Sequence, residues 1–126
     1  VWHMHESLER LCVLAYQWPR ICIGSSGQYR IVGNSEWWAR MAEALPLICD
    51  SRGRPVCKIH GLRMLNPAVF TRLPLSSADS TNVARNVGLD VRWKGTYAPP
   101  TKEARAELIC RRIEAYNAAT CWSPTP

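Results

Sequence analysis

The sequence predicts an α/β fold in which about four strand-then-helix units with parallel strands form the C-terminal half of a (β/α)8 TIM-type barrel. Short apolar runs alternate along the chain with segments of helical periodicity. No hairpin turn separates one run from the next, so we expect successive strands to be parallel. Each run ends in His, Gly or Ser, as strands do where a barrel carries its active site. Four units in 126 residues match half of the roughly 250 residues of a whole barrel.

Apolar runs, capping residues and prolines indicate where each expected element begins and ends. The four apolar runs expected as strands are residues 1–4, 20–23, 55–59 and 73–75. The expected helix caps are Ser7, Asn34 or Ser35, and Asn66 followed by Pro67, and the last helix is expected to start near Thr101. Trp18-Pro19 ends the first helix, and Pro46 ends or kinks the second. One or two helical turns are expected over residues 82–87, followed by an irregular loop at 89–100.

The last helix shows an apolar face with arginines outside it. The residues predicted to be buried are Ala104, Leu108, Ile113, Tyr116 and Ala119, and those predicted to lie largely outside are Arg105, Arg111 and Arg112. Two tryptophans, Trp37 and Trp38, occupy the apolar side of the second helix. We expect one of them to pack in the core and the other to be partly exposed.

A half barrel has two open strand edges and an exposed inner face. We therefore expect residues 1–126 to be a single domain that is a fragment of a longer chain, or a domain that a second copy completes. A doubly wound sheet is the second candidate, but Gly24-Ser25-Ser26-Gly27 is a poor match to the glycine-rich turn of that fold.

Composition narrows the class of protein. The net charge of +6 and the pI of about 9.3 favour a polyanionic partner, DNA or RNA. No run of eighteen apolar residues and no signal peptide is present, which predicts no membrane partner. The six cysteines form no CxxC pair, so we expect free, buried thiols in a reducing cytoplasm, bacterial or phage-infected, rather than a zinc knuckle.

Three consecutive strand ends resemble those of the tRNA-guanine transglycosylase superfamily. The segments are ICIGSSGQY at residues 21–29, IHGLRMLNP at 59–67 and LPLSSADSTNVARN at 73–86. The closest likeness is to the phage and bacterial branch that inserts 7-deazaguanine bases into DNA. The resemblance implies a nucleobase-exchange glycosyltransferase that acts on DNA or RNA and a 7-deazaguanine base, without a cofactor. The clustered cysteines and His that hold zinc in the tRNA enzymes of the superfamily are absent, which favours DNA over tRNA.

The resemblance makes Asp79 the nucleophile, because it is the only carboxylate in the matching segment. A carboxylate would attack the anomeric carbon, guanine would leave, and a deazaguanine would attack in turn. The donors available nearby to hold such a carboxylate are Ser76, Ser77, Ser80 and Thr81. The alternative is that Asp79 or Ser80 caps a helix that begins near Asn82.

Other strand ends supply further candidates. His5 and Glu6 follow the first run and suit proton transfer or recognition of a base edge. His3 lies on the same strand face as His5, but no third ligand is placed, so we predict no metal. The candidates for contact with the base or phosphate are Gly24, Ser25, Ser26, Gly27, His60, Gly61 and Arg63. A tight turn and a surface arginine are the alternatives for the glycines and for Arg63.

The loop after residue 84 combines basic and aromatic residues, which suits contact with nucleic acid. Arg85, Arg92 and Lys94 are the candidate phosphate contacts, and Trp93 and Tyr97 could stack on bases. An ordinary solvated loop is the alternative. Two other functions stay open: a non-catalytic phage-type protein that binds nucleic acid or a host-defence complex, and a hydrolase that uses Glu6 and Asp79.

Overall fold

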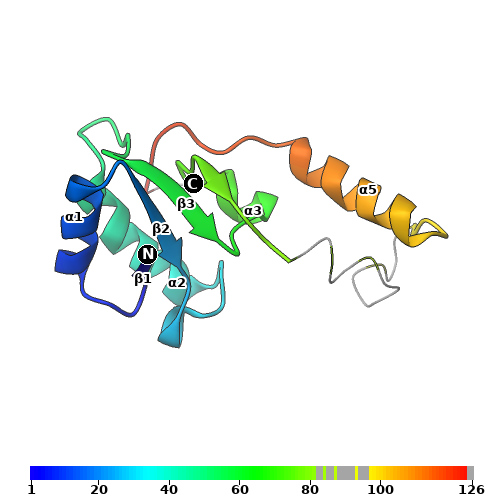
Figure 1. Ribbon diagram of the computed structural model, residues 1–126, viewed down its shortest axis with the longest axis horizontal. Coiled ribbons are helices and arrows are strands. Elements are labelled where there is room, and N and C mark those ends of the chain that lie inside the picture. The colour runs from blue at the N-terminus through cyan, green and yellow to red at the C-terminus, as the bar shows by residue number, and fades with distance from the viewer. Residues whose placement is uncertain (82–83, 85–86, 88–92, 94–96, 125–126) are drawn as a thin grey trace.

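A computed structural model shows a four-stranded parallel sheet with the strand order β1-β2-β3-β4 (Figure 1). It describes residues 1–81, 84, 87, 93 and 97–124. The strands are β1 (Trp2–His3), β2 (Arg20–Gly24), β3 (Lys58–Leu62) and β4 (Ser77–Ala78). The helices are α1 (Leu8–Gln17), α2 (Ser35–Ala44), α3 (Pro67–Phe70) and α5 (Lys102–Glu114), with 3₁₀ turns η1 (Gly27–Tyr29) and η2 (Leu45–Ile48). The predicted α/β class and the parallel order of the strands are confirmed.

Each of the four helices starts where the sequence predicts, at a side chain that accepts a backbone N–H. Ser7, Asn34, Asn66 and Thr101 are the caps, and their oxygens accept from Arg10, Trp37, Ala68 and Ala104. These bonds satisfy amides that the first turn of a helix leaves without partners. The cap of α2 is therefore Asn34 and not Ser35.

Two strands are displaced from their predicted positions. The third run was expected at residues 55–59, but Pro55 forms an antiparallel bridge with Cys49, and β3 begins only at Lys58. The fourth was expected at residues 73–75, but β4 begins at Ser77. Leu73 is fully buried in the core, and Leu75 is nearly so. Leu73 and Leu75 are apolar because they pack, whereas Val56 of the third run is exposed. Apolar character alone therefore does not separate a strand from a connection.

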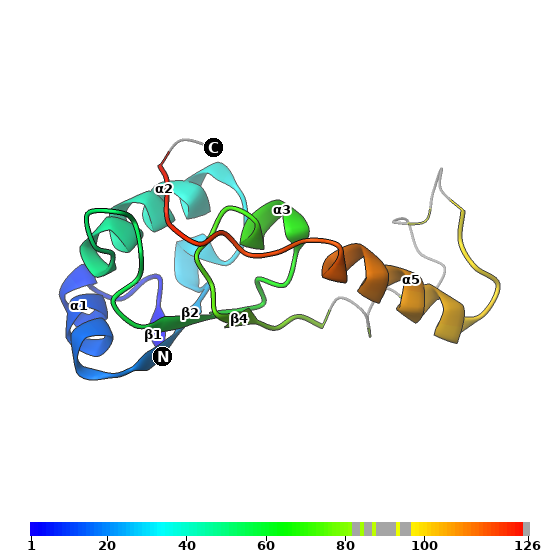
Figure 2. The same ribbon diagram turned by 90° about the horizontal axis from the view of Figure 1, so that it is seen from above.

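The core lies on one face of the sheet. Ile21 and Ile23 of β2 and Ile59 of β3 are buried and pack with residues of α1, α2 and α3. These helices lie on one side of the strands in Figure 2, which views the sheet along its edge. The alternation of buried and less buried residues along β2 and β3 follows from the two-residue period of a strand.

The other face of the sheet carries a polar row. Cys22 lies opposite His60, and His60 lies opposite Ser77, so these three residues project on the same face of three adjacent strands. A doubly wound sheet would carry helices on both faces and reverse its strand order. This sheet has sequential order and a one-sided helical cover among the described residues.

The helix α5 extends away from the sheet (Figures 1 and 2). Its predicted orientation is wrong at Arg105, which is 5% exposed, and at Tyr116, which is exposed. The Arg105 guanidinium donates to the carbonyl oxygens of Val87 and, at 2.8 Å, Pro99. Backbone carbonyls of the preceding segment thus make a buried arginine favourable where periodicity predicted a surface one.

The six cysteines are free, as predicted, but they are less buried than predicted. Cys121 is exposed and the other five are half-buried. Burial still raises the pKa of the Cys49 thiol to about 11, with a smaller contribution from neighbouring Asp50. A thiol with a raised pKa is a weak nucleophile at neutral pH.

We expect Gly61→Ala to destabilise the protein by about 1–3 kcal/mol. A Cβ at Gly61 would come within 2.8 Å of the Met64 sulfur and 2.9 Å of a Leu75 methyl group, both in the core. Urea unfolding would measure the loss. Gly24→Ala is the control, because its Cβ meets only flexible side-chain ends at 3.0 Å or more, namely His3 and Leu62. An equal loss in the two variants would contradict the packing argument.

Candidate active site at the carboxyl ends of the strands

The candidate residues gather at one edge of the sheet because parallel strands end on the same side. The residues at this edge are the end of β1 and the turn after it (3–6), the end of β2 and its turn (24–27), the end of β3 with Arg63 (60–63), and β4 with the two residues after it (77–80). Polar contacts divide these residues into two clusters. One joins the ends of β3 and β4, and the other joins the ends of β1 and β2.

The β3–β4 cluster is built around His60. Its Nδ1 lies 2.8 Å from the Ser77 hydroxyl, and its Nε2 lies 3.2 Å from Oδ2 of Asp79. The other carboxyl oxygen of Asp79, Oδ1, accepts the backbone N–H of Arg63 at 2.8 Å. The backbone adds further links, since the N–H of Asp79 donates to the carbonyl of Gly61. The carboxylate is therefore fixed from both sides.

Asp79 is ionised, oriented and accessible. The Arg63 N–H, the His60 hydrogen bond and the charges of both residues hold the pKa of Asp79 below its ordinary value of 3.8. Its side chain is nevertheless 54% exposed. The described hydrogen bonds of its carboxylate are to residues at the end of β3. The alternative prediction was that Asp79 caps a helix at residues 82–87, and of these only 84 and 87 are among the described residues.

Arg63 has a left-handed backbone, with φ at 60°. A side chain in this region costs roughly 1–2 kcal/mol, because Cβ crowds the following carbonyl. This conformation accompanies the turn that directs the Arg63 N–H to Asp79. Its side chain is exposed. Strain of this kind is found where surrounding structure fixes a functional group.

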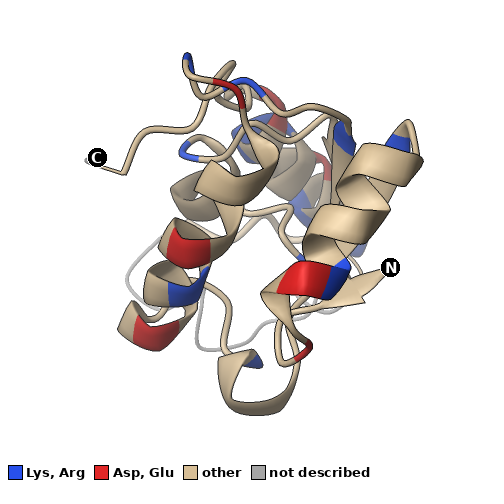
Figure 3. Cartoon of the chain, turned by 90° about the vertical axis from the view of Figure 1, so that its left-hand side faces the viewer, with Lys and Arg blue, Asp and Glu red and all other residues tan. Residues whose placement is uncertain are grey.

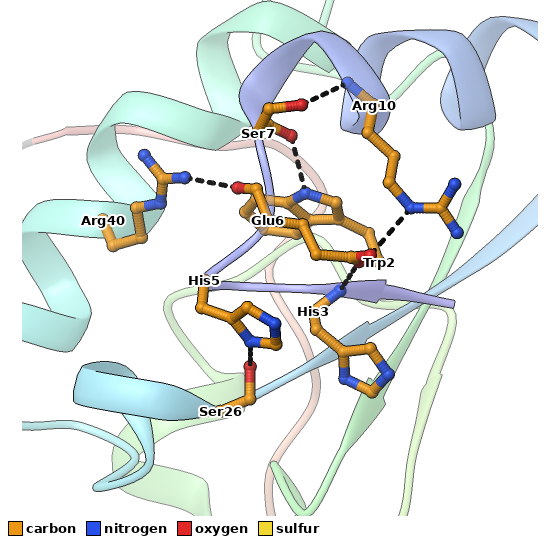
Figure 4. A network of polar contacts seen from close by, with 8 residues as sticks. All are labelled: Trp2, His3, His5, Glu6, Ser7, Arg10, Ser26 and Arg40. Carbon is orange, nitrogen blue, oxygen red and sulfur yellow. Dashed lines mark hydrogen bonds and ion pairs between the residues drawn. The ribbon is translucent and has the colours of Figure 1, made fainter.

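The β1–β2 cluster contains the two other histidines (Figure 4). The His5 Nδ1 lies 2.7 Å from the Ser26 hydroxyl, and the rings of His3 and His5 stack with centroids 5.9 Å apart. Gly27 has a φ of 59°, and a Cβ there would lie 3.1 Å from Cβ of His5. The glycine thus serves the tight turn, and it also lets His5 approach.

Glu6 holds the turn after β1. One carboxyl oxygen accepts the backbone N–H of His3 at 2.7 Å, and the other forms an ion pair with Arg10 at 3.0 Å. The His3 N–H is the main reason why the pKa of Glu6 is lowered. Both oxygens are engaged, which favours a positioning role for Glu6 over proton transfer; its catalytic role stays a prediction.

Arg40 joins helix α2 to this turn and was not singled out from the sequence. Its guanidinium donates to the carbonyl oxygen of Met4 at 3.0 Å and to that of Glu6 at 2.8 Å, the latter shown in Figure 4. The same guanidinium lies against the rings of Trp2 and Tyr29, 5.6 and 5.5 Å from their centroids. No sequence motif marks such an arginine, because its partners are backbone carbonyls 34 and 36 positions away.

The tryptophan pair packs as predicted. Trp37 is fully buried, and its indole N–H donates to the Ser25 hydroxyl at 2.8 Å. Trp38 is half-buried and carries the Arg72 guanidinium 3.9 Å from its ring centroid. The Ser25 hydroxyl therefore accepts a hydrogen bond from a core side chain. Ser80, another predicted site residue, is half-buried and directly follows Asp79.

The predicted nucleic-acid contacts Arg85, Arg92 and Lys94 lie outside the described residues. Trp93 is 7% exposed with the Arg112 guanidinium 5.7 Å from its ring centroid, so its ring is not open to a base. Tyr97 is exposed. Segments with Lys or Arg alternate with segments carrying Asp or Glu on the side shown in Figure 3, so the charge of +6 does not form one basic face there.

Within the described ranges, no group of three His, Cys, Asp or Glu side chains is placed to hold a metal ion. The helices of the same part of the chain include none that is long and apolar enough to span a membrane. Comparisons of the chain with models of protein families, with curated proteins and with solved structures found no match.

Arg63→Gly should be more stable than Arg63→Ala by about 1 kcal/mol, because glycine alone relieves the left-handed strain. Both variants remove the guanidinium and keep the backbone N–H that Asp79 accepts. Chemical unfolding of the two variants gives the difference. Equal stabilities would show that residue 63 is not held at positive φ.

Acid should destabilise the wild-type protein more than Asp79→Asn. The folded pKa of Asp79 lies below 3.8, so its ionised form stabilises the fold above that pH and the stabilisation is lost as the pH falls through the lower folded value. Unfolding free energies measured from neutral pH to below 3.8 test this. Asp50→Asn should flatten the curve independently, because two backbone N–H groups lower the pKa of Asp50 as well. Superimposable curves for wild type and Asp79→Asn would contradict the argument.

Proposed function

We propose that this chain is the C-terminal half of a barrel enzyme of the tRNA-guanine transglycosylase type, which exchanges guanine in DNA for a 7-deazaguanine base, with Asp79 as the nucleophile. A tRNA substrate is the second candidate. The free thiols and the lack of a membrane-spanning helix among the described residues fit an enzyme of the bacterial or phage-infected cytoplasm.

One observation carries the proposal: the Asp79 carboxylate is ionised and fixed by two donors, yet more than half of its side chain is exposed. Asp50 is likewise ionised, exposed and held by two donors, so what distinguishes Asp79 is its contact with His60 at the carboxyl ends of the strands. A carboxylate that attacks a sugar carbon needs the negative charge, the fixed direction and access to substrate together.

The chemistry follows from these features. An oxygen of Asp79 forms a bond to the anomeric carbon as the bond from that carbon to guanine breaks. The electron pair of the broken bond leaves with the purine, which takes up a proton. In the second half of the exchange, the 7-deazaguanine loses a proton, attacks the same carbon and releases the carboxylate. The net reaction exchanges one base for another and needs no cofactor.

The sheet itself supports a half barrel. Its edge strands β1 and β4 are short, and its polar face lacks a helical cover in the described part of the chain. Four more parallel strands, from another part of the protein or a second copy, would pair with both edges and turn the polar face into a barrel interior. The strand ends would then surround one mouth.

The decisive test is a covalent adduct. The purified chain is incubated with guanine-containing DNA and then denatured, and mass spectrometry locates any attached deoxyribosyl group. We expect the adduct on Asp79, its loss in Asp79→Asn, and its release with incorporation of the new base when preQ0 is added.

Asp50→Asn is the matched control, because Asp50 is also exposed and also held by two donors, the backbone N–H groups of Arg52 and Arg54. It should form the adduct at the wild-type rate. Salt-dependent DNA binding without an adduct would instead favour the non-catalytic nucleic-acid-binding protein.

A further inference from the structure

His60 contacts both Ser77 and Asp79, an arrangement that the role of Asp79 as nucleophile does not by itself explain. His60 contacts Asp79 through Nε2 and Ser77 through Nδ1, at 3.2 and 2.8 Å. Its side chain is 23% exposed, so the ring is held by two contacts and is still partly accessible to solvent. Register fixes the arrangement, because His60 and Ser77 are directly paired across β3 and β4.

The chemistry of the two partners determines where the ring carries its protons. An ionised carboxylate only accepts hydrogen bonds, so the Nε2 that faces Asp79 must carry a proton. The Ser77 hydroxyl both donates and accepts. It can donate to Nδ1 of a neutral ring or accept from Nδ1 of an imidazolium. The ring can therefore change its charge without changing its position.

We propose that His60 is the proton carrier of the exchange: it protonates the departing guanine and takes the proton back from the incoming base. The inference rests on the proposed function, in which Asp79 attacks the sugar. The exchange needs one proton at its first step and releases one at its second, and a fixed residue that is stable in both charge states can hold that proton between them.

The charges balance in each half of the exchange. Imidazolium and carboxylate precede the attack. As Asp79 becomes a neutral ester, it stops attracting the Nε2 proton, which passes to the leaving purine. The ring is then neutral with its proton on Nδ1, which donates to the Ser77 oxygen. The second half reverses these steps: Nε2 takes the proton of the incoming base, and the carboxylate is freed.

The titratable and charged groups around the ring are few among the described residues. Asp79 contacts the ring directly, and Arg63 acts on Asp79 through its backbone N–H and its charge. Cys22 lies opposite it on β2, and Lys58 precedes it by two positions on the same face of β3. Asp79 is the one carboxylate among them and the direct partner of Nε2.

The test compares a leaving base that needs a proton with one that does not. Guanine must be protonated as it departs, whereas 7-methylguanine already carries a positive charge and leaves without an acid. His60→Gln keeps an N–H donor for Asp79 but transfers no proton. We expect it to slow adduct formation with guanine-containing DNA on the order of 10²-fold, and to leave adduct formation with 7-methylguanine-containing DNA close to the wild-type rate.

Every outcome of this comparison either supports or overturns the role of His60 as proton carrier. Equal slowing of His60→Gln on both DNAs would reduce His60 to a positioning residue and overturn the inference, as would normal rates on both. Loss of both adducts in Asp79→Asn, with only the guanine adduct slowed in His60→Gln, supports it. If wild type forms no adduct even with 7-methylguanine, the proposed function fails, and the inference, which rests on it, falls with it.

Ser77→Ala supplies a second readout on the same ring. Without the hydroxyl, Nδ1 loses its partner in both charge states, so we expect a smaller slowing that again spares 7-methylguanine. Nitrogen NMR of His60 measures the ring directly: Nε2 should carry a proton in wild type in either charge state of the ring. A proton found on Nδ1 alone would overturn the inference without any activity measurement.

Discussion

The fold depends on burial of only one face of its sheet. Ile21, Ile23 and Ile59 project toward the helices and leave water, which is the main favourable contribution to stability. The period of two then forces Cys22 and His60 onto the opposite face. Because this second face is not needed for the core, it can carry polar side chains without a stability penalty, and the candidate site lies at its carboxyl end.

The two clusters at this edge are stabilised in different ways. Arg40 reaches from α2 to the carbonyls after β1, and hydrogen bonds of a charged group to such carbonyls contribute about 1.5–3 kcal/mol. The turn that carries His5 is therefore held by a helix behind it. Asp79 is held by neighbours from the adjacent strand end, namely His60 and the N–H of Arg63. Its position thus depends on the register of β3 and β4.

Signals from residues close together in the sequence predicted some parts of this structure and failed for others. Caps are local, and the sequence predicted Ser7, Asn66 and the choice between Asn34 and Ser35 as caps. It also predicted the start of the last helix near Thr101. The displaced starts of β3 and β4 and the buried Arg105 depend on partners distant in sequence, such as Cys49 for Pro55 and the Pro99 carbonyl for Arg105. The candidates His60, Ser77 and Asp79 were named individually because each follows a run that was predicted to be a strand. That His60 bridges the other two depends on register, which apolar patterning does not define for so short a strand as β4.

Register also explains why an exposed aspartate and an ordinary histidine form a chemically useful pair. A single residue of slip between β3 and β4 would turn Ser77 to the helical face and break its contact with His60. The packing of Gly61 against Met64 and Leu75 opposes such a slip, because any larger residue brought to that position meets the core. The buried face of the sheet thus sets the distances on the polar face. Helix-side packing holds the Ser77–His60–Asp79 contacts in place, although none of the three residues is itself buried.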